Sequence, residues 1–267
     1  MSVTILIPAR FASVRYPGKP LVSLVGAKGD SKTLIQRSWE AARAVKGVSR
    51  VAVTTDDARI KDAAEAFGAE VIMTSSECRN GTERCAEAVA HLGSDTEIVV
   101  NLQGDAPLTP AWFVEDLVDG LRSAPEIDMA TPVLRADGAT LLGFLADRKA
   151  GRVGGTTAVF NQKGEALYFS KEVIPFVPNA PEPDVMQTPV FHHVGVYAYR
   201  PQALADYAGW EMGPLESLEG LEQLRFLEQG RKILCVEVQA KGRHFWELNN
   251  PEDVAKLESM MKAMDIA

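Results

Sequence analysis

The chain has 267 residues, 46% of them hydrophobic, and a formal net charge of −8. This length suits one large α/β domain or one domain with an added lobe, and the acidic balance argues against nonspecific nucleic-acid binding, which needs a basic surface. Three scattered cysteines do not suit a disulfide scaffold or a zinc cluster. No apolar run approaches the ~20 residues that cross a bilayer, and no leader segment is visible, so we expect a soluble cytoplasmic protein without membrane partners.

The first predicted element is a strand over residues 3–7, which is β-branched and bounded by Pro8. Such a run is typical of a buried strand in a parallel sheet. The following loop holds three cations, Arg10, Arg15 and Lys19, among small residues and without acidic neighbours. Nucleotides bind at the carboxyl ends of strands in open α/β sheets, and a triphosphate needs several cations on one surface. The loop therefore predicts an anion site, with a solvated basic loop as the alternative.

Two common nucleotide motifs are missing from this loop. It contains neither Gly-x-x-x-x-Gly-Lys-Ser/Thr nor Gly-x-Gly-x-x-Gly. Their absence argues against a P-loop NTPase and against a Rossmann dehydrogenase.

Further elements follow from periodicity. Helices are predicted over residues 33–45, 58–67, 81–92, 110–123, 217–229 and 251–264, and strands over 48–55, 70–74, 97–102, 158–160, 166–169, 194–199 and 232–238. The strand–helix alternation of the first half favours a parallel sheet with helices on both faces. We expect an α/β fold, Rossmann-like and mostly parallel, in one domain over residues 1–267, with a smaller inserted β-rich lobe within about 127–215. Residues 175–189, rich in proline, should be a surface loop.

Three places carry residues suited to chemistry. Gln103-Gly104-Asp105 ends the strand around residues 98–100, where Asp105 could hold Mg²⁺ against phosphates or simply cap the next helix. Gly81-Thr82-Glu83-Arg84 opens a helix, whose N–H groups could meet an anion or a base, or Thr82 could serve only as the cap. His193 and Tyr197 have the spacing of one strand face.

Several motifs in a fixed order give a resemblance to a known family. They are Pro17-Gly18-Lys19-Pro20-Leu21, Asn80 to Arg84, Asn101 to Asp105, Ala166 to Ser170, His193 to Tyr197, Leu221 to Arg225, and Pro251-Glu252-Asp253. With the leading strand and its arginines, they resemble the sugar-acid cytidylyltransferases, and within these the 3-deoxy-manno-octulosonate (Kdo) type. The resemblance implies a nucleotide-diphospho-sugar transferase fold and the activation of a 3-deoxy-ulosonic acid with CTP, giving CMP-sugar and pyrophosphate for lipopolysaccharide or capsule synthesis.

The resemblance also assigns residues. Nucleotide contacts are implied for Pro8, Ala9, Arg10, Arg15, Lys19, Gly81, Thr82, Arg84 and Gln103. Sugar contacts are implied for Gln103, His193, Tyr197, Glu222 and Gln223. The catalytic residues would be Arg10, Lys19 and Asp105, and the cofactor Mg²⁺ would be held by Asp105 and Asn249. The family further implies a homodimer, with dimerisation through the β-rich lobe.

Three positions depart from the family pattern. Asn249 stands where the family has a second magnesium-binding Asp, and the nearby Glu247 could substitute for it. Thr157 replaces a Lys, and His192 replaces a cation. The cations Arg148, Lys149 and Arg152, in a loop with Gly151, Gly154 and Gly155, could supply the charge or be merely solvated. With these changes, the substrate could instead be a modified octulosonate such as the 8-amino acid, or a nonulosonate. The protein could also be a nucleotide-binding paralogue with impaired turnover.

Overall fold

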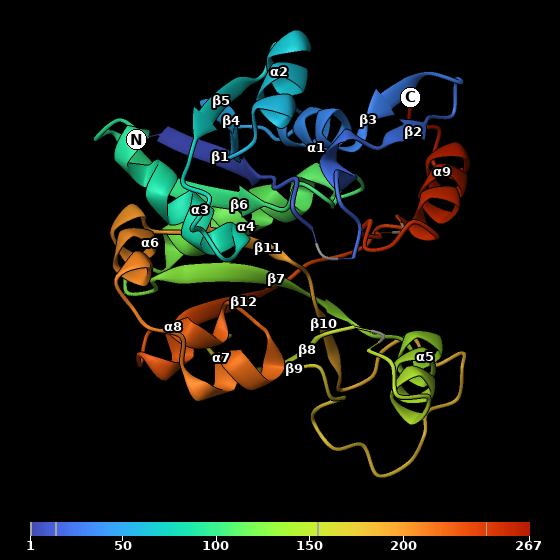
Figure 1. The fold of residues 1–267 in the computed structure, drawn as a ribbon. Helices are drawn as coiled ribbons and strands as arrows, with labels where there is room; N and C mark the ends of the chain where they lie inside the picture. The colour runs from blue at the N-terminus through green and yellow to red at the C-terminus, as the bar shows by residue number, and fades with distance from the viewer. Residues whose placement is uncertain (1, 14, 154, 244) are drawn as a thin grey trace. The chain divides into compact units, whose positions relative to one another are not determined.

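The computed structural model describes residues 2–13, 15–153, 155–243 and 245–267. They form two compact units (Figure 1). Unit 1 comprises Met1–Glu115, Tyr199–Ala208 and Ala240–Ala267, and unit 2 comprises Asp116–Ala198 and Gly209–Gln239. The expected organisation, a single domain with a β-rich lobe within about residues 127–215, stays a prediction.

Unit 1 is built on a parallel sheet. Its strands, in the order β5-β4-β1-β6, are β5 (Glu70–Met73), β4 (Arg50–Thr55), β1 (Ser2–Pro8) and β6 (Thr96–Leu102). In β1, Ile5 pairs with Val51 on one side and with Val100 on the other. Because β1 has strands on both sides and its residues from 3 to 8 are buried, its sequence is a continuous apolar run.

Helices alternate with these strands along the chain. Unit 1 contains α1 (Leu34–Arg43), α2 (Ala58–Ala66), α3 (Gly81–Ala88), α6 (Pro201–Ala208) and α9 (Asp253–Ala263), the 3-10 helices η1 (Lys19–Leu21) and η2 (Val89–His91), and the hairpin of β2 (Ser23–Val25) and β3 (Ser31–Thr33). Side chains of Thr33, Asp57 and Asn80 cap α1, α2 and α3. The cap of α3 is thus Asn80, so Thr82 as the cap is wrong. The α/β fold class is confirmed.

Unit 2 contains a mixed sheet and shorter helices. Its strands are β7 (Met129–Arg135), β8 (Thr157–Phe160), β9 (Ala166–Ser170), β10 (Phe191–His193), β12 (Ile233–Glu237) and β11 (Val196–Tyr199), whose last residue belongs to unit 1. β12 runs parallel to β7, whereas β10 is antiparallel to both β7 and β8, and β8 and β9 form an antiparallel pair. The helices are α5 (Gly138–Lys149), α7 (Pro214–Glu219) and α8 (Leu224–Glu228), and α4 (Ala111–Ser123) runs from unit 1 into unit 2.

The structure corrects the sequence prediction in unit 2. The helix expected over 217–229 is two helices, because Gly220 adopts a left-handed φ of 61° and ends α7. The single strand face expected for His193 and Tyr197 is wrong, because β10 ends at His193 and β11 begins at Val196. Helices α5 and α6 were not expected, since the first is rich in glycine and small residues and the second is short.

Within the described residues, no helix combines the length and apolar character that spanning a membrane requires.

Candidate active site

The loop after β1 is closed by its own backbone. Ala9 N–H donates to Thr54 O at the end of β4 (2.9 Å), and Phe11 O accepts from the N–H groups of Ser13 and Gly18 (both 2.9 Å). Gly18 adopts φ 72°, a conformation that few other residues adopt, just before η1 begins at Lys19. These bonds bring Phe11 and Gly18 together at the base of the loop. Val14 lies outside the described residues.

The three cations of this loop contact other segments of unit 1. Arg10 Nη1 donates to the backbone oxygen of Arg79 (3.2 Å), just before α3. Arg15 Nη2 donates to Asn249 Oδ1 (2.9 Å), and Lys19 Nζ pairs with Asp105 Oδ2 (2.6 Å). Three segments far apart in the sequence thus meet: the loop after β1, the end of β6 and the residues before α9.

Asp105 is fixed by its neighbours at the end of β6. A Cβ on Gly104 would lie 2.7 Å from Pro8 O, so only glycine permits this approach of the two strand ends. Ser38 Oγ donates to Gly104 O (2.9 Å), and Leu248 N–H donates to Asp105 O (2.9 Å). The last contact brings the segment of Glu247 and Asn249 to Asp105.

Glu247 and Asn249 add two oxygen-bearing side chains beside Asp105. The pKa of the partly buried Glu247 is raised to about 7, first by burial and then by the negative charge of Asp105. Asp253 accepts hydrogen bonds from the backbone N–H groups of Asn249 (3.0 Å) and Asn250 (2.8 Å), which explains the role of the Pro-Glu-Asp motif. The carboxylates of Asp105 and Glu247 are thus close enough for one charge to affect the other, and the amide oxygen of Asn249 lies nearby. Such a set of oxygen donors suits a hard divalent cation.

The set is small for a metal held by protein alone. Among the described residues, no group of three or more His, Cys, Asp and Glu side chains is arranged to hold a metal ion. Mg²⁺ usually binds one or two carboxylates and completes its shell with phosphate and water. The residues present fit that mode of binding.

The start of α3 approaches the end of β6 and β1. A Cβ on Gly81 would lie 3.2 Å from both amide atoms of Gln103 and from Pro8 Cγ, so these three residues are brought together. Gln103 Nε2 also donates to the buried Asn101 Oδ1 (3.3 Å).

Thr82 and Arg84 lie inside unit 1 instead. Thr82, 1% exposed, has Oγ1 3.2 Å from Tyr199 Oη. Arg84, 3% exposed, contacts Asp56 Oδ1 (3.1 Å) and the hydroxyl of Thr74. Their direct contact with a nucleotide stays a prediction.

In unit 2, three of the residues expected to contact sugar, His193, Tyr197 and Gln223, form a buried network. The rings of His193 and Tyr197 are 5.6 Å apart, and Tyr197 Oη donates to Gln223 Oε1 (3.3 Å). His193 Nε2 lies 3.0 Å from Thr131 Oγ1. Gln223 is 2% exposed, and its Nε2 finds no hydrogen-bond partner among the described residues. Such an atom can donate to a ligand oxygen.

The network is electrically neutral. Burial, assisted by neighbouring His192, lowers the pKa of His193 to about 3, and burial lowers that of His192 to about 4. Both imidazoles are therefore uncharged at neutral pH.

Two acidic residues that sequence reasoning missed frame the segment of Glu222 and Gln223. Glu216 makes a bidentate, buried ion pair with Arg225 (2.6 and 2.7 Å). Glu219 accepts from Ser170 Oγ (2.7 Å) and from Lys171 N–H (2.9 Å). Their spacing gives no signal in the sequence, because the partners lie on different elements.

Two of the three family departures, Thr157 and His192, belong to unit 2. Thr157 is fully buried, and its hydroxyl donates to Glu172 O (2.6 Å). Arg148 forms an ion pair with Glu172, and Arg152 pairs with Asp147 (2.7 Å). These two arginines are thus neutralised locally, while Lys149 is exposed and Gly154 lies outside the described residues.

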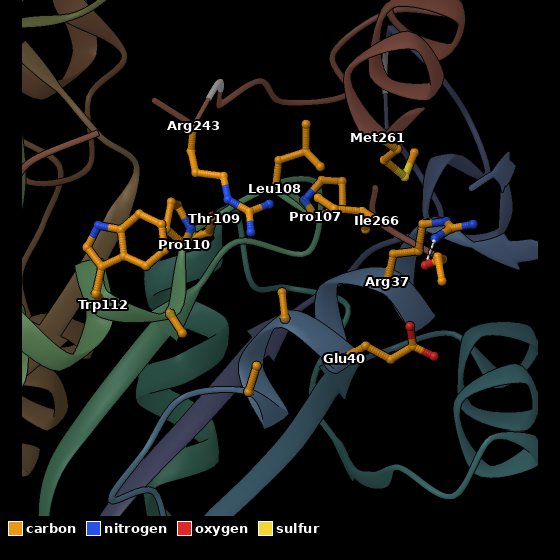
Figure 2. A pocket seen from close by; sticks show the side chains of 14 residues that line it. Arg37, Glu40, Pro107, Leu108, Thr109, Pro110, Trp112, Arg243, Met261 and Ile266 are labelled. Atoms are coloured by element: carbon orange, nitrogen blue, oxygen red, sulfur yellow. Dashed lines mark hydrogen bonds between the residues drawn. The ribbon is translucent and has the colours of Figure 1, made fainter. Parts of the chain in front are cut away.

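Figure 2 shows a cavity of about 320 Å³ in unit 1. Its lining includes Arg37, Trp112, Arg243 and Met261, with residues 107–110. None of the residues expected to bind nucleotide, sugar or metal lines it.

Comparison with known proteins matches this arrangement to one family. The sequence pattern of the family described as cytidylyltransferase matches residues 4–233. The chain is 45% identical over 263 residues to 3-deoxy-manno-octulosonate cytidylyltransferase of Maricaulis maris (98% of each chain), and 41% identical over 263 residues to 8-amino-3,8-dideoxy-manno-octulosonate cytidylyltransferase of Shewanella pealeana (98% of this chain, 99% of the other). A solved structure of CMP:2-keto-3-deoxy-manno-octonic acid synthetase complexed with CTP has a TM-score of 0.83 and 34% identity, covering 99% of this chain and 100% of that one. On this evidence the chain belongs to the cytidylyltransferase family.

Proposed function

We propose that the protein transfers the cytidylyl group of CTP to a 3-deoxy-ulosonic acid, Kdo, giving CMP-Kdo and pyrophosphate for lipopolysaccharide or capsule synthesis. The observation that carries this proposal is the meeting, in unit 1, of the cationic loop after β1 with Asp105 and Asn249. The relatives and the CTP-complexed structure, alike over nearly the whole chain, support the same reaction.

In the proposed reaction, the anomeric hydroxyl oxygen of the sugar acid attacks the α-phosphorus of CTP. The bond from that phosphorus to the bridging oxygen of the β-phosphate breaks, pyrophosphate leaves with the electron pair, and the hydroxyl proton is released. No covalent enzyme intermediate is required, so the chain contributes positioning and charge stabilisation. Arg10, Arg15 and Lys19 hold the β- and γ-phosphates, whose oxygens replace Asn249 and Asp105 as partners of Arg15 and Lys19.

We further propose that Asp105 and Asn249 hold Mg²⁺, with Glu247 as a third oxygen donor. When bound, the ion supplies charge neutralisation at the phosphates. The place of Glu247 supports this assignment, because it adjoins Leu248, whose N–H donates to Asp105 O (2.9 Å), and lies close enough to Asp105 for that carboxylate to raise its pKa.

The neutral network of unit 2 supports the sugar contacts. Tyr197, His193 and Gln223 offer donors and acceptors suited to hydroxyl groups, and Glu222 lies beside Gln223 in the segment between α7 and α8. Pro8, Ala9, Gly81 and Gln103 remain our candidates for the base and ribose.

A second candidate substrate is the 8-amino-3,8-dideoxy acid. Relatives of that specificity are 40–41% identical to the chain over 97–98% of its length. The local pairing of Arg148 and Arg152, and the neutrality of His192, favour this candidate, because they leave fewer free cations in unit 2 to repel an ammonium group.

One assay tests these proposals. Purified protein is incubated with CTP and Mg²⁺ and with Kdo, the 8-amino acid or a nonulosonate in turn. Pyrophosphate release is measured, and the CMP-sugar is identified by mass spectrometry. We expect release with Kdo, and a higher kcat/KM for the 8-amino acid would select the second candidate. Binding of CTP without release on any acid would instead identify an impaired paralogue.

We also propose that the protein is a cytoplasmic homodimer. Phe176 and Met186 of unit 2 are 87% and 81% exposed, which supports a partner surface, and the three free cysteines suit a reducing compartment. Light scattering after size exclusion tests the dimer: Phe176→Ser with Met186→Ser should yield monomer. Cell fractionation tests the location.

A further inference from the structure

We propose that Arg59 is a positioning residue of the CTP site: through the ring of Phe11, it holds residues 11–13 and 15–18 in the arrangement that presents Arg15 and Lys19. This inference rests on the proposed function. Arg59 comes from α2, an element that carries none of the residues assigned to the nucleotide, sugar or metal.

The geometry of the contact is specific. The guanidinium carbon of Arg59 lies 3.3 Å from the centroid of the Phe11 ring. Asp57, the cap of α2, accepts from Arg59 Nε (2.9 Å) and Nη2 (2.6 Å) and also from the Arg59 backbone N–H (2.9 Å). Because this pairing fixes the guanidinium, its position over the ring is set by the start of α2.

Phe11 in turn closes the loop, through both its backbone and its ring. Its carbonyl oxygen closes the turn by accepting from Ser13 and Gly18, and its ring lies against Gly18, where a Cβ would come within 3.1 Å of Phe11 Cζ. Arg59 therefore holds the residue whose backbone closes the loop and whose side chain packs on the glycine before Lys19. A chain of contacts thus runs from α2 through Phe11 to Gly18, which precedes Lys19, in the loop that also carries Arg15.

The same contacts indicate that Arg59 acts through Phe11 and not by direct contact with the nucleotide. Two of its guanidinium nitrogens are engaged by Asp57, and the Phe11 ring covers one face of the group. An ordered loop loses less conformational entropy when it binds the triphosphate, so affinity rises without a new ligand contact.

The first test is kinetic. Arg59→Gln should raise the KM for CTP about two- to fivefold, as expected for an exposed cation–π contact, with kcat and the sugar KM unchanged. Arg59→Lys should recover part of the loss. Arg43→Gln is the matched control, because Arg43 makes the same kind of contact, over the Trp39 ring (5.7 Å), at the last residue of α1. The kinetics of Arg43→Gln should equal those of the wild type. An unchanged KM for CTP in Arg59→Gln would overturn the proposal.

The second test asks whether Arg59 acts through Phe11. If it does, Phe11→Leu should raise the KM for CTP at least as much as Arg59→Gln, because it also loses the packing on Gly18. Adding Arg59→Gln to Phe11→Leu should then raise the KM no further, because the interaction of Arg59 is already lost. Additive effects would overturn the proposal and make Arg59 an independent contributor.

The third test does not depend on turnover. Trypsin should cut after the exposed Arg15 faster in Arg59→Gln than in the wild type or Arg43→Gln, as followed by intact mass without CTP. Equal cutting rates would overturn the loop-ordering role. If the wild type failed to use CTP, the proposed function would fail, while the tryptic result would still report on the loop.

Discussion

In unit 1 the candidate nucleotide residues Arg15 and Lys19 are charged and lie on a loop, paired with Asn249 and Asp105. In unit 2 the candidate sugar residues His193, Tyr197 and Gln223 are buried, uncharged and joined through ring contacts and hydrogen bonds. The difference follows the chemistry proposed for each ligand. A triphosphate is bound mainly by charge and can be met by flexible cations, whereas sugar hydroxyls are distinguished by fixed donors and acceptors. Changes in the two regions should therefore affect different kinetic constants.

The largest effect is expected for Asp105→Asn. We expect kcat to fall by about 100-fold or more, because a charged group at the reacting phosphates is lost. Equal far-ultraviolet circular dichroism and thermal unfolding of the two proteins would establish that the fold is intact. Wild-type turnover at low Mg²⁺ would instead show that Asp105 is only a structural residue at the end of β6.

The next largest effect is expected for Arg15→Ala, which should change the kinetic constant for CTP but not the one for the sugar acid. Losing a charge-assisted contact with phosphate removes about 1.5–3 kcal/mol, so kcat/KM for CTP should fall about 10- to 100-fold while the KM for the sugar acid stays constant. Initial rates with each substrate varied in turn measure both constants. If the sugar KM rises equally, Arg15 does not act on phosphate alone.

The reciprocal change is Gln223→Leu in unit 2. The KM for the sugar acid should rise about tenfold with the KM for CTP unchanged, because the buried amide that we propose as a donor to a sugar oxygen is lost. Tyr197→Phe is the milder companion variant, since it removes only the hydroxyl that donates to Gln223. A change in the CTP constant alone would break the proposed division between charged and neutral regions.

The smallest effect is expected for Asn249→Asp. A carboxylate binds Mg²⁺ more strongly than an amide, so half-saturating Mg²⁺ should fall about two- to fivefold. Titration of Glu247→Gln in parallel locates the third ligand. No shift in Asn249→Asp, together with a large loss in Glu247→Gln, would show that Glu247 and not Asn249 carries the metal role.

Local patterns in the chain were enough to predict the α/β class and to single out the segments that meet around the cationic loop of unit 1. These segments are local patterns: the buried strand β1 with the cations after it, and Gln103-Gly104-Asp105 at the end of β6. A short stretch of sequence is enough to identify a strand and the loop that follows it. Because parallel strands bring their carboxyl ends to one edge of the sheet, the loops can then be expected to lie close together. The helix starts near residues 33, 58 and 81 were predictable for the same reason, since a cap is a local signal.

The pairing of residues that are distant in the sequence was visible only in the folded chain. The contacts Arg15–Asn249, Lys19–Asp105 and Glu216–Arg225 join residues on different elements, and the burial that keeps His193 neutral comes from its packing. The break at Gly220 and the separation of β10 from β11 likewise depend on the turn that each segment must make. Periodicity reports which face of an element is apolar, but it carries no information on which other element will cover that face, and side-chain ionisation depends on that cover.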